Sequence, residues 1–364
     1  MAPGAIADAI AARADAAFGI ALLGSEPAAP YNVAMRICVY GAGAVGGHIA
    51  ARLAAAGEEV SVVGRGAHLA AMRERGITLL HGDERITGKV RATDDPASLG
   101  PQQLVIVTLK ANALSGIAKE LKSMLKGDTA FVFAQNGIPW WYGNGLAASR
   151  PRPPDLSRLD PGGALAAALP VASVIGAVVH SANDVVEPGV VENRTPGNNM
   201  LVVGEMDDRA SPRIKEIRRM LEGAGLSSPA AADIRQAVWS KLVLNMGTGT
   251  LCLLTGATVA DVRGDPGVLE VLSRITAEAR AIAAAHGVDV DGAPVRPSGK
   301  PSSGRIAHKP SILQDYERGR PMEIEAQLVT PLAFARAANL ATPTLDALVP
   351  LAVHKGASKG LYTK

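Results

Sequence analysis

The chain has 364 residues, enough for two domains that each bury a full core. An apolar content of 48% and a charged content of 20% exclude a disordered chain. A net charge of +3, with no run of Lys and Arg, argues against nucleic acid or a membrane surface as a partner.

Residues 1–34 form an Ala-rich leader, which we exclude from the fold. It has no basic segment followed by an uninterrupted apolar stretch, so we expect no signal peptide, although a short helix fits Ala5–Phe18. We find no apolar run of transmembrane length. Cys38 and Cys252 fall in apolar segments and are predicted to be buried free thiols of a cytoplasmic protein.

The stretch Met35–Arg65 has the pattern of a dinucleotide-binding unit. Strands are predicted at Ile37–Tyr40 and Val60–Val63, with a helix between them. The turn before the helix, here called the nucleotide turn, has G-x-G-x-x-G spacing and consists of Gly41, Ala42, Gly43, Ala44, Val45 and Gly46. Gly41 permits the tight turn, and Gly43 permits the close approach of a pyrophosphate. Gly46 lets the helix pack on the strand. Because the helix N-terminus also presents unpaired N–H groups, we expect this turn to bind the cofactor.

The residues after the second strand favour NADP over NAD. An NAD site usually has Asp or Glu there, to bind the ribose 2′-OH, whereas this chain has Gly64 and Arg65. A guanidinium can pair with a 2′-phosphate. Taken alone, Arg65 is also compatible with a solvated loop charge. We predict NADPH/NADP+ as the cofactor.

More segments of an α/β domain follow this unit. They are a helix over Ala67–Arg75, a β pair at Ile77–Leu80 and Ile86–Ala92, strands at Leu104–Leu109 and Ala130–Ala134, and a helix over Ile117–Leu125. Lys110 and Asn136 come directly after two of these strands. Since open α/β sheets bind ligands at the carboxyl ends of their strands, both residues are site candidates.

The middle of the chain is less regular. Pro139–Gly163 is predicted to be a long surface loop, and Trp140 and Trp141 at its start either line a cleft or anchor the loop at the surface. Three β-branched runs are expected to extend the sheet: Val171–His180, Val185–Val191 and Met200–Val203. Pro212–Leu221 is predicted to be a helix, and Ser227–Ala231 a hinge region.

Helical spacing then dominates and no strand signal returns. The predicted helices are Asp233–Leu254, Pro266–Ala285, Met322–Ala338 and Pro343–His354, with a basic loop at Pro294–Pro310. We expect Thr342 to cap the last helix and Pro350 to kink or break it. The predicted fold class is an α/β N-terminal Rossmann-type domain over residues 35–228 plus an all-α C-terminal domain over residues 229–364, with the active site between them.

Two segments of the helical half contain candidate catalytic groups. Lys241 and Asn245 are four residues apart and therefore share a helix face. A lysine that faces a dry cleft can donate a proton near neutral pH, although a partly exposed helix lysine explains the spacing as well. Ser311 fits the N-cap of a short helix and Glu323 a first-turn acid, so both also have a purely structural explanation.

The order of the motifs resembles the ketopantoate reductase (2-dehydropantoate 2-reductase) family. GAGAVGG in the nucleotide turn is followed by TLKAN, QNG, SKLVLN, PSILQD and RPMEIE, and the resemblance runs from Met35 to the C-terminus. It implies NADPH-dependent reduction of the 2-oxo group of ketopantoate to pantoate, in pantothenate biosynthesis. It also implies a C-terminal domain like that of 6-phosphogluconate dehydrogenase.

The resemblance further implies a role for each matching residue. Lys241 would be the general acid, and Glu323 would hold the substrate hydroxyl and help orient Lys241. Asn136 and Asn245 would contact substrate or cofactor, Ser311 the substrate carboxylate, and Lys110 the nicotinamide ribose and the substrate.

Two positions depart from the family pattern, because Gly249 and His308 stand where the family usually has Asn. A paralogue acting on another 2-oxo acid, or a non-catalytic NADP(H)-binding sensor, therefore stays open. The expected partner is a small 2-oxo acid, with a homodimer left open. The seven histidines are scattered, which predicts no metal site.

Overall fold

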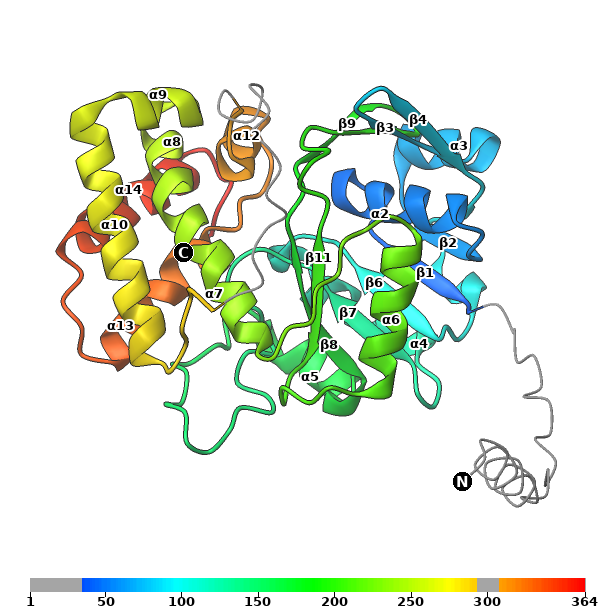
Figure 1. The fold of residues 1–364 in the computed structure, drawn as a ribbon, viewed down its shortest axis with the longest axis horizontal. Helices are drawn as coiled ribbons and strands as arrows, with labels where there is room; N and C mark the ends of the chain where they lie inside the picture. Colours follow the sequence, from blue (N-terminus) through cyan, green and yellow to red (C-terminus); the bar gives the residue numbers. More distant parts are fainter. Residues whose placement is uncertain (1–34, 293–307, 364) are drawn as a thin grey trace, which may run out of the picture. The chain divides into compact units, whose positions relative to one another are not determined.

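The computed structural model describes residues 35–292 and 308–363 (Figure 1). The expected helix over Ala5–Phe18 and most of the expected loop Pro294–Pro310 lie outside these residues.

A seven-stranded sheet forms the centre of the N-terminal half. Its spatial order is β11-β8-β7-β6-β1-β2-β5, and all neighbours are parallel except β11, which runs antiparallel to β8. The strands are β1 (Ile37–Tyr40), β2 (Val60–Val63), β5 (Arg91–Thr93), β6 (Leu104–Val107), β7 (Ala130–Phe133), β8 (Val174–Val179) and β11 (Leu201–Glu205).

Both faces of this sheet are buried, which explains its nearly continuous apolar strands. In β1, Ile37 and Val39 face one core, whereas Cys38 and Tyr40 face the other. Helices α2 (Ala44–Ala55), α3 (Gly66–Arg75) and α6 (Pro212–Gly223) contribute to the first core, and α4 (Ala118–Met124) and α5 (Ala164–Ala168) to the second. Both cysteines are buried free thiols, as predicted.

A second sheet lies on α2, and the sequence did not reveal it. Its order is β4-β3-β10-β9, made of β3 (Ile77–His81), β4 (Glu84–Gly88), β9 (Asn183–Glu187) and β10 (Val190–Asn193). The prediction that Val185–Val191 extends the main sheet is therefore wrong, while the runs before and after it do extend it. The expected strand Ile86–Ala92 is also divided, since β4 ends at Gly88 and β5 pairs with β2.

Close packing against α2 accounts for this second sheet. A Cβ on Gly47 would lie 2.7 Å from Val191 Cγ2, and a Cβ on Gly88 would lie 2.5 Å from Ala54 Cβ. The two glycines let the strands approach the helix, a contact between segments far apart in sequence that local patterns do not contain.

The C-terminal half is helical, and no strand follows Glu205 within the described ranges. It contains α7 (Ile234–Leu244), α8 (Thr250–Thr255), α9 (Val259–Gly264), α10 (Pro266–Ala285), α12 (Ser311–Glu317), α13 (Thr330–Ala337) and α14 (Pro343–Ser358). Two short π-helical segments, here called π-turns, precede α8 and α13; they are Asn245–Gly249 and Glu325–Val329. Helix α7 packs against β8 and β11 and joins the sheet to the other helices (Figure 1).

One prediction about α14 is wrong and another is confirmed. Pro350 does not end it, because the helix continues to Ser358 and Pro350 lies on its exposed face, where water can bond the carbonyl that proline leaves unpaired. Thr342 occupies the N-cap position, as predicted, although its side chain makes no cap bond. The carboxylate of Glu278 instead accepts the N–H groups of Thr344 and Leu345 (2.8 Å each).

The continuous helical segment Ile234–Thr255 is long and apolar enough to cross a membrane, with a mean hydropathy of 1.2. This corrects the expectation that no run reaches that length. Because 67% of the window is buried inside the structure, the segment is packed as a core helix of a globular protein.

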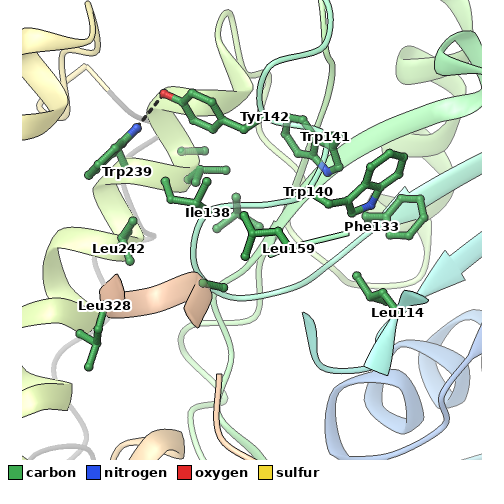
Figure 2. Packing of buried hydrophobic residues seen from close by; sticks show 14 of the residues in the cluster. Leu114, Phe133, Ile138, Trp140, Trp141, Tyr142, Leu159, Trp239, Leu242 and Leu328 are labelled. Atoms are coloured by element: carbon green, nitrogen blue, oxygen red, sulfur yellow. Dashed lines mark hydrogen bonds between the residues drawn. The ribbon is translucent and has the colours of Figure 1, made fainter. Parts of the chain in front are cut away.

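The tryptophans at the start of the predicted surface loop belong to the core. Trp141 is fully buried, and its neighbour Tyr142 accepts a hydrogen bond from Trp239 Nε1 of α7 (2.8 Å; Figure 2). Arg235, also fully buried, donates to the carbonyls of Tyr142 (3.0 Å) and Met206 (2.7 Å). These contacts of Trp141, Tyr142 and Arg235 fix α7 on the N-terminal half. The Pro- and Gly-rich composition of the loop did not predict them.

Candidate active site

The nucleotide turn has the geometry that its glycines predict. Gly41 has a φ of +100°, and α2 begins at Ala44 without a side-chain cap and without an acidic residue in its first turn. A Cβ on Gly46 would lie 2.4 Å from both Gly41 O and Thr108 Oγ1, whereas a Cβ on Gly43 would have no heavy atom within 4 Å. The helix thus lies close to β1, with open space over Gly43 beside its unpaired N–H groups.

Arg65 lies at the carboxyl end of β2, where the adenosine ribose of a dinucleotide is expected. It is exposed and occupies the N-cap position of α3. Its guanidinium is therefore accessible to a ligand that lies along the edge of the sheet.

A cleft of about 930 Å³, here called the central cleft, lies between the two halves. Five of the predicted site residues line it: Val45, Asn136, Lys241, Asn245 and Ser311. Its volume is in the range of small-molecule sites. Groups from the nucleotide turn, from the QNG motif and from two helical segments, Ile234–Thr255 and α12, therefore meet around one space.

Lys241 is half-buried on α7, and its ammonium donates a hydrogen bond to the carbonyl of Val179, the last residue of β8. Asn245 follows in the π-turn, on the side of the helix that faces the central cleft. The structure thus places an amine from the helical half at the carboxyl end of the sheet.

Glu323 is buried beside the central cleft and is surrounded by donors. Its carboxylate accepts hydrogen bonds from Ala111 N (3.0 Å), Asn136 Nδ2 (3.4 Å) and Gln327 Nε2 (3.4 Å). Burial raises the pKa of Glu323, and the bond from Ala111 opposes this effect. The residue lies just before the helical segment that starts at Ile324 rather than in its first turn.

Gly137 explains how Asn136 reaches Glu323. Gly137 has a φ of +84°, and a Cβ there would lie 2.4 Å from the carbonyl of Ala326 in the second π-turn. That carbonyl also accepts the N–H of Ile138 (2.8 Å). The QNG motif therefore packs directly on the turn that follows Glu323.

Lys110 is not among the described residues that line the central cleft, and its ammonium contacts the helical half. Its ammonium forms an ion pair with Asp315 of α12 (2.6 Å) and donates to the Pro321 carbonyl (3.1 Å). Burial raises the pKa of Asp315, and Lys110 opposes this effect. Ser311 is the first residue of α12, and Pro310 occupies the N-cap position predicted for it.

Sequence reasoning missed several residues around the central cleft. Gln327 is four residues after Glu323, so the same-face rule could have identified it. His180 directly follows β8, the kind of position that singled out Lys110 and Asn136. Asp184 and Arg318 also line the central cleft and form an ion pair with each other (3.4 Å). No local sequence pattern predicts this contact.

The two departures from the family pattern also line the central cleft. A Cβ on Gly249 would make ordinary contact with Ile312 Cγ2, at 3.5 Å. His308 lies just before α12, beside Lys309 and Pro310, and its carbonyl accepts the N–H of Val259 in α9 (3.2 Å). The changes therefore alter the wall of the cleft and leave Lys241 and Glu323 in place.

Comparisons with known proteins agree on one family. The family model "Ketopantoate reductase PanE/ApbA" matches residues 37–144, and "Ketopantoate reductase PanE/ApbA C terminal" matches residues 233–355. A 2-dehydropantoate 2-reductase from Mesorhizobium japonicum is 36% identical over 331 residues, which is 90% of this chain and 100% of that protein.

Solved structures show the same fold. A Ralstonia solanacearum protein assigned as a ketopantoate reductase is similar with a TM-score of 0.77 and 35% identity, over 90% of this chain and 99% of that one. A D-mandelate dehydrogenase solved with NADH and anilino(oxo)acetate has a TM-score of 0.74 at 19% identity, over 90% of this chain and 100% of that one.

Proposed function

Because the chain belongs to the ketopantoate reductase family, we propose that it catalyses the NADPH-dependent reduction of 2-dehydropantoate to (R)-pantoate. The observation that carries this proposal is the central cleft, which joins Val45 of the nucleotide turn to Lys241 and Asn245 of the helical half. A hydride donor and a proton donor can act on one carbonyl group there.

The nucleotide turn fits a nicotinamide dinucleotide. The open space over Gly43 suits a pyrophosphate, and the uncapped N-terminus of α2 offers N–H donors and the positive end of the helix dipole. A nicotinamide bound in this way supplies hydride to the carbonyl carbon. Arg65 would bind the 2′-phosphate, which favours NADPH over NADH.

Lys241 would supply the proton. Hydride addition builds negative charge on the carbonyl oxygen, and an ammonium within hydrogen-bond distance stabilises that charge before it transfers a proton from Nζ. The hydrogen bond to Val179 holds Lys241 at the carboxyl end of β8. Glu323 would accept the substrate hydroxyl and help orient Lys241.

The other predicted residues would bind the substrate or the cofactor. Asn136 and Asn245 offer amide groups to substrate or cofactor, and Ser311 would contact the substrate carboxylate. Lys110 would reach the nicotinamide ribose and the substrate after exchanging its contact with Asp315.

A substrate panel tests the proposal. NADPH oxidation, followed by absorbance, should be fastest with 2-dehydropantoate. Tight NADPH binding without turnover of any 2-oxo acid would instead identify a sensor, and faster turnover of another 2-oxo acid would identify a paralogue. The sensor is not favoured, since it would need neither Lys241 nor Glu323.

Lys241→Ala tests the proton donor. We expect kcat to fall by about 10²–10⁴-fold, the usual contribution of a general acid, with NADPH affinity unchanged. Wild-type turnover in this variant would remove Lys241 from the mechanism.

Arg65→Ala tests the cofactor assignment. The dissociation constant for NADPH should rise about tenfold or more, because a charge-assisted bond to a 2′-phosphate contributes about 1.5–3 kcal/mol. The constant for NADH should change little. Equal effects on the two cofactors would refute the 2′-phosphate role.

A homodimer and a cytoplasmic location complete the proposal. The ketopantoate reductase of Staphylococcus aureus, which shares the fold at 19% identity, is described as dimeric. In this chain, Leu351 of α14 is 55% exposed beside an apolar groove between α8, α10 and α14. Light scattering after size exclusion would decide the assembly state. The buried free thiols fit a reducing cytoplasm.

A further inference from the structure

The segment that contains Glu323 is held from its far side by residues that the proposed chemistry does not use. Just before Glu323, the N–H of Met322 donates to the carbonyl of Leu361 (2.9 Å), in the segment that follows α14. Just after it, Glu325 accepts a hydrogen bond from the hydroxyl of Tyr362 (2.5 Å). Two adjacent residues thus fix the chain on both sides of the buried carboxylate.

Arg158 completes this contact from the loop that precedes α5. Its Nε forms an ion pair with Glu325 (2.9 Å), and its Nη2 donates to the hydroxyl of Tyr362 (3.2 Å) and the carbonyl of Thr363 (3.3 Å). The side chain of Glu325 is 17% exposed, whereas that of Arg158 is 53% exposed, so water screens the ion pair only on its outer side. Three segments far apart in sequence therefore meet at Glu325.

The packing beneath these bonds leaves little room for movement. Gly356 of α14 accepts the N–H of Leu361 (2.9 Å), and a Cβ on Gly356 would lie 2.5 Å from Ile324 Cδ1 and 3.4 Å from Tyr362 Cβ. Ile324 directly follows Glu323. A shift of Tyr362 would therefore be transmitted to the backbone that carries the carboxylate.

We propose that Tyr362 and Arg158 are positioning residues, which act through Glu325 to hold Glu323 at its place beside the central cleft. Neither residue lines that cleft in the described part of the chain. Gln327 lies in the same π-turn as Glu325 and donates a hydrogen bond to Glu323. A displacement of this π-turn would therefore also remove the Gln327 donor from Glu323. The inference rests on the role proposed for Glu323.

Two variants and one control test this inference. Tyr362→Phe removes the hydroxyl, and Arg158→Gln removes the ion pair from a side chain that is 53% exposed, so it leaves the core intact. We expect each to lower kcat about tenfold, since small misplacements of catalytic groups cost up to about 10²-fold. NADPH affinity should stay unchanged. Tyr316→Phe is the matched control, because the Tyr316 hydroxyl makes no hydrogen bond within the described residues.

Hydrogen exchange at Ala111 gives a readout that does not depend on turnover. This N–H donates to Glu323 (3.0 Å), so its exchange should accelerate in Tyr362→Phe and Arg158→Gln but not in Tyr316→Phe. If Tyr362→Phe fails to fold, Arg158→Gln decides. An inactive wild type refutes the proposed function, while Ala111 exchange still tests the positioning. Unchanged kcat and unchanged Ala111 exchange in a folded variant overturn the inference, whatever happens to its melting temperature.

Discussion

Two glycines of the nucleotide turn lie in contrasting surroundings, so alanine substitutions should separate cofactor binding from folding. Gly43 has a negative φ of −79°, which alanine can also adopt, and a Cβ there would meet no heavy atom within 4 Å. At Gly46 the Cβ would lie 2.4 Å from Gly41 O and Thr108 Oγ1. Gly43→Ala should therefore keep the stability of the wild type, and Gly46→Ala should be less stable.

The expected magnitudes follow from these distances. The methyl of Gly43→Ala fills the space assigned to the pyrophosphate, and overpacking of this size costs about 1–3 kcal/mol. That cost corresponds to a rise of about 5- to 150-fold in the dissociation constant for NADPH. In Gly46→Ala the 2.4 Å separations must grow to at least 3.0 Å, so α2 must move away from β1. We expect a loss of about 1–3 kcal/mol in the free energy of unfolding, reduced by about 1 kcal/mol because alanine favours the helix.

The assays are NADPH fluorescence titration and thermal or urea unfolding, both on the wild type and the two variants. Gly43→Ala should keep the wild-type melting temperature and lose affinity, whereas Gly46→Ala should lose stability. Wild-type NADPH affinity in Gly43→Ala would refute the placement of the pyrophosphate. Equal losses of stability in the two variants would refute the packing argument.

Two further predictions concern buried titratable groups. Glu323→Gln should lose most turnover yet gain stability at neutral pH. Burial raises the pKa of Glu323, so the wild type loses stability as the pH rises through that pKa. The variant has no carboxyl group at this position and does not show this loss. Melting temperatures from about pH 4 to about pH 8 would show the difference widening, and a constant difference would contradict it. Burial, reinforced by Arg52 and His81, lowers the pKa of His48 to about 3. The protein should therefore lose up to about 1.4 kcal/mol per pH unit below about pH 6.5, a slope that His48→Gln should reduce in urea unfolding; identical slopes would exclude His48 as the cause.

Local patterns predicted most elements of the main sheet and of the helical half. The helix Pro266–Ala285 has the predicted bounds, because Asp265 caps it, Pro266 fits its first turn and its apolar face repeats at helical spacing. The β-branched residues of β1 and β2 likewise define strands that are buried on both faces. In such segments the local preference and the tertiary environment agree.

Pairing between distant segments was not predictable in the same way. β10 pairs with β3 because Gly47 and Gly88 let a second sheet lie on α2, and Trp141 is buried because Gly176 leaves room for its ring. A β-branched run specifies a strand but not the neighbour beside which it lies. Loop composition specifies turns, and it does not show that one of their side chains enters a core.

The sequence by itself determined the nucleotide turn, the shared face of Lys241 and Asn245, and the position of Asn136 after its strand, because each follows from spacing along one segment. Only the tertiary structure decided that Glu323 accepts from Ala111 and Asn136, that Lys110 pairs with Asp315, and that Tyr362 holds the chain beside Glu323. These contacts join segments that approach one another only when the two halves pack together, and no local preference of the chain specifies that packing.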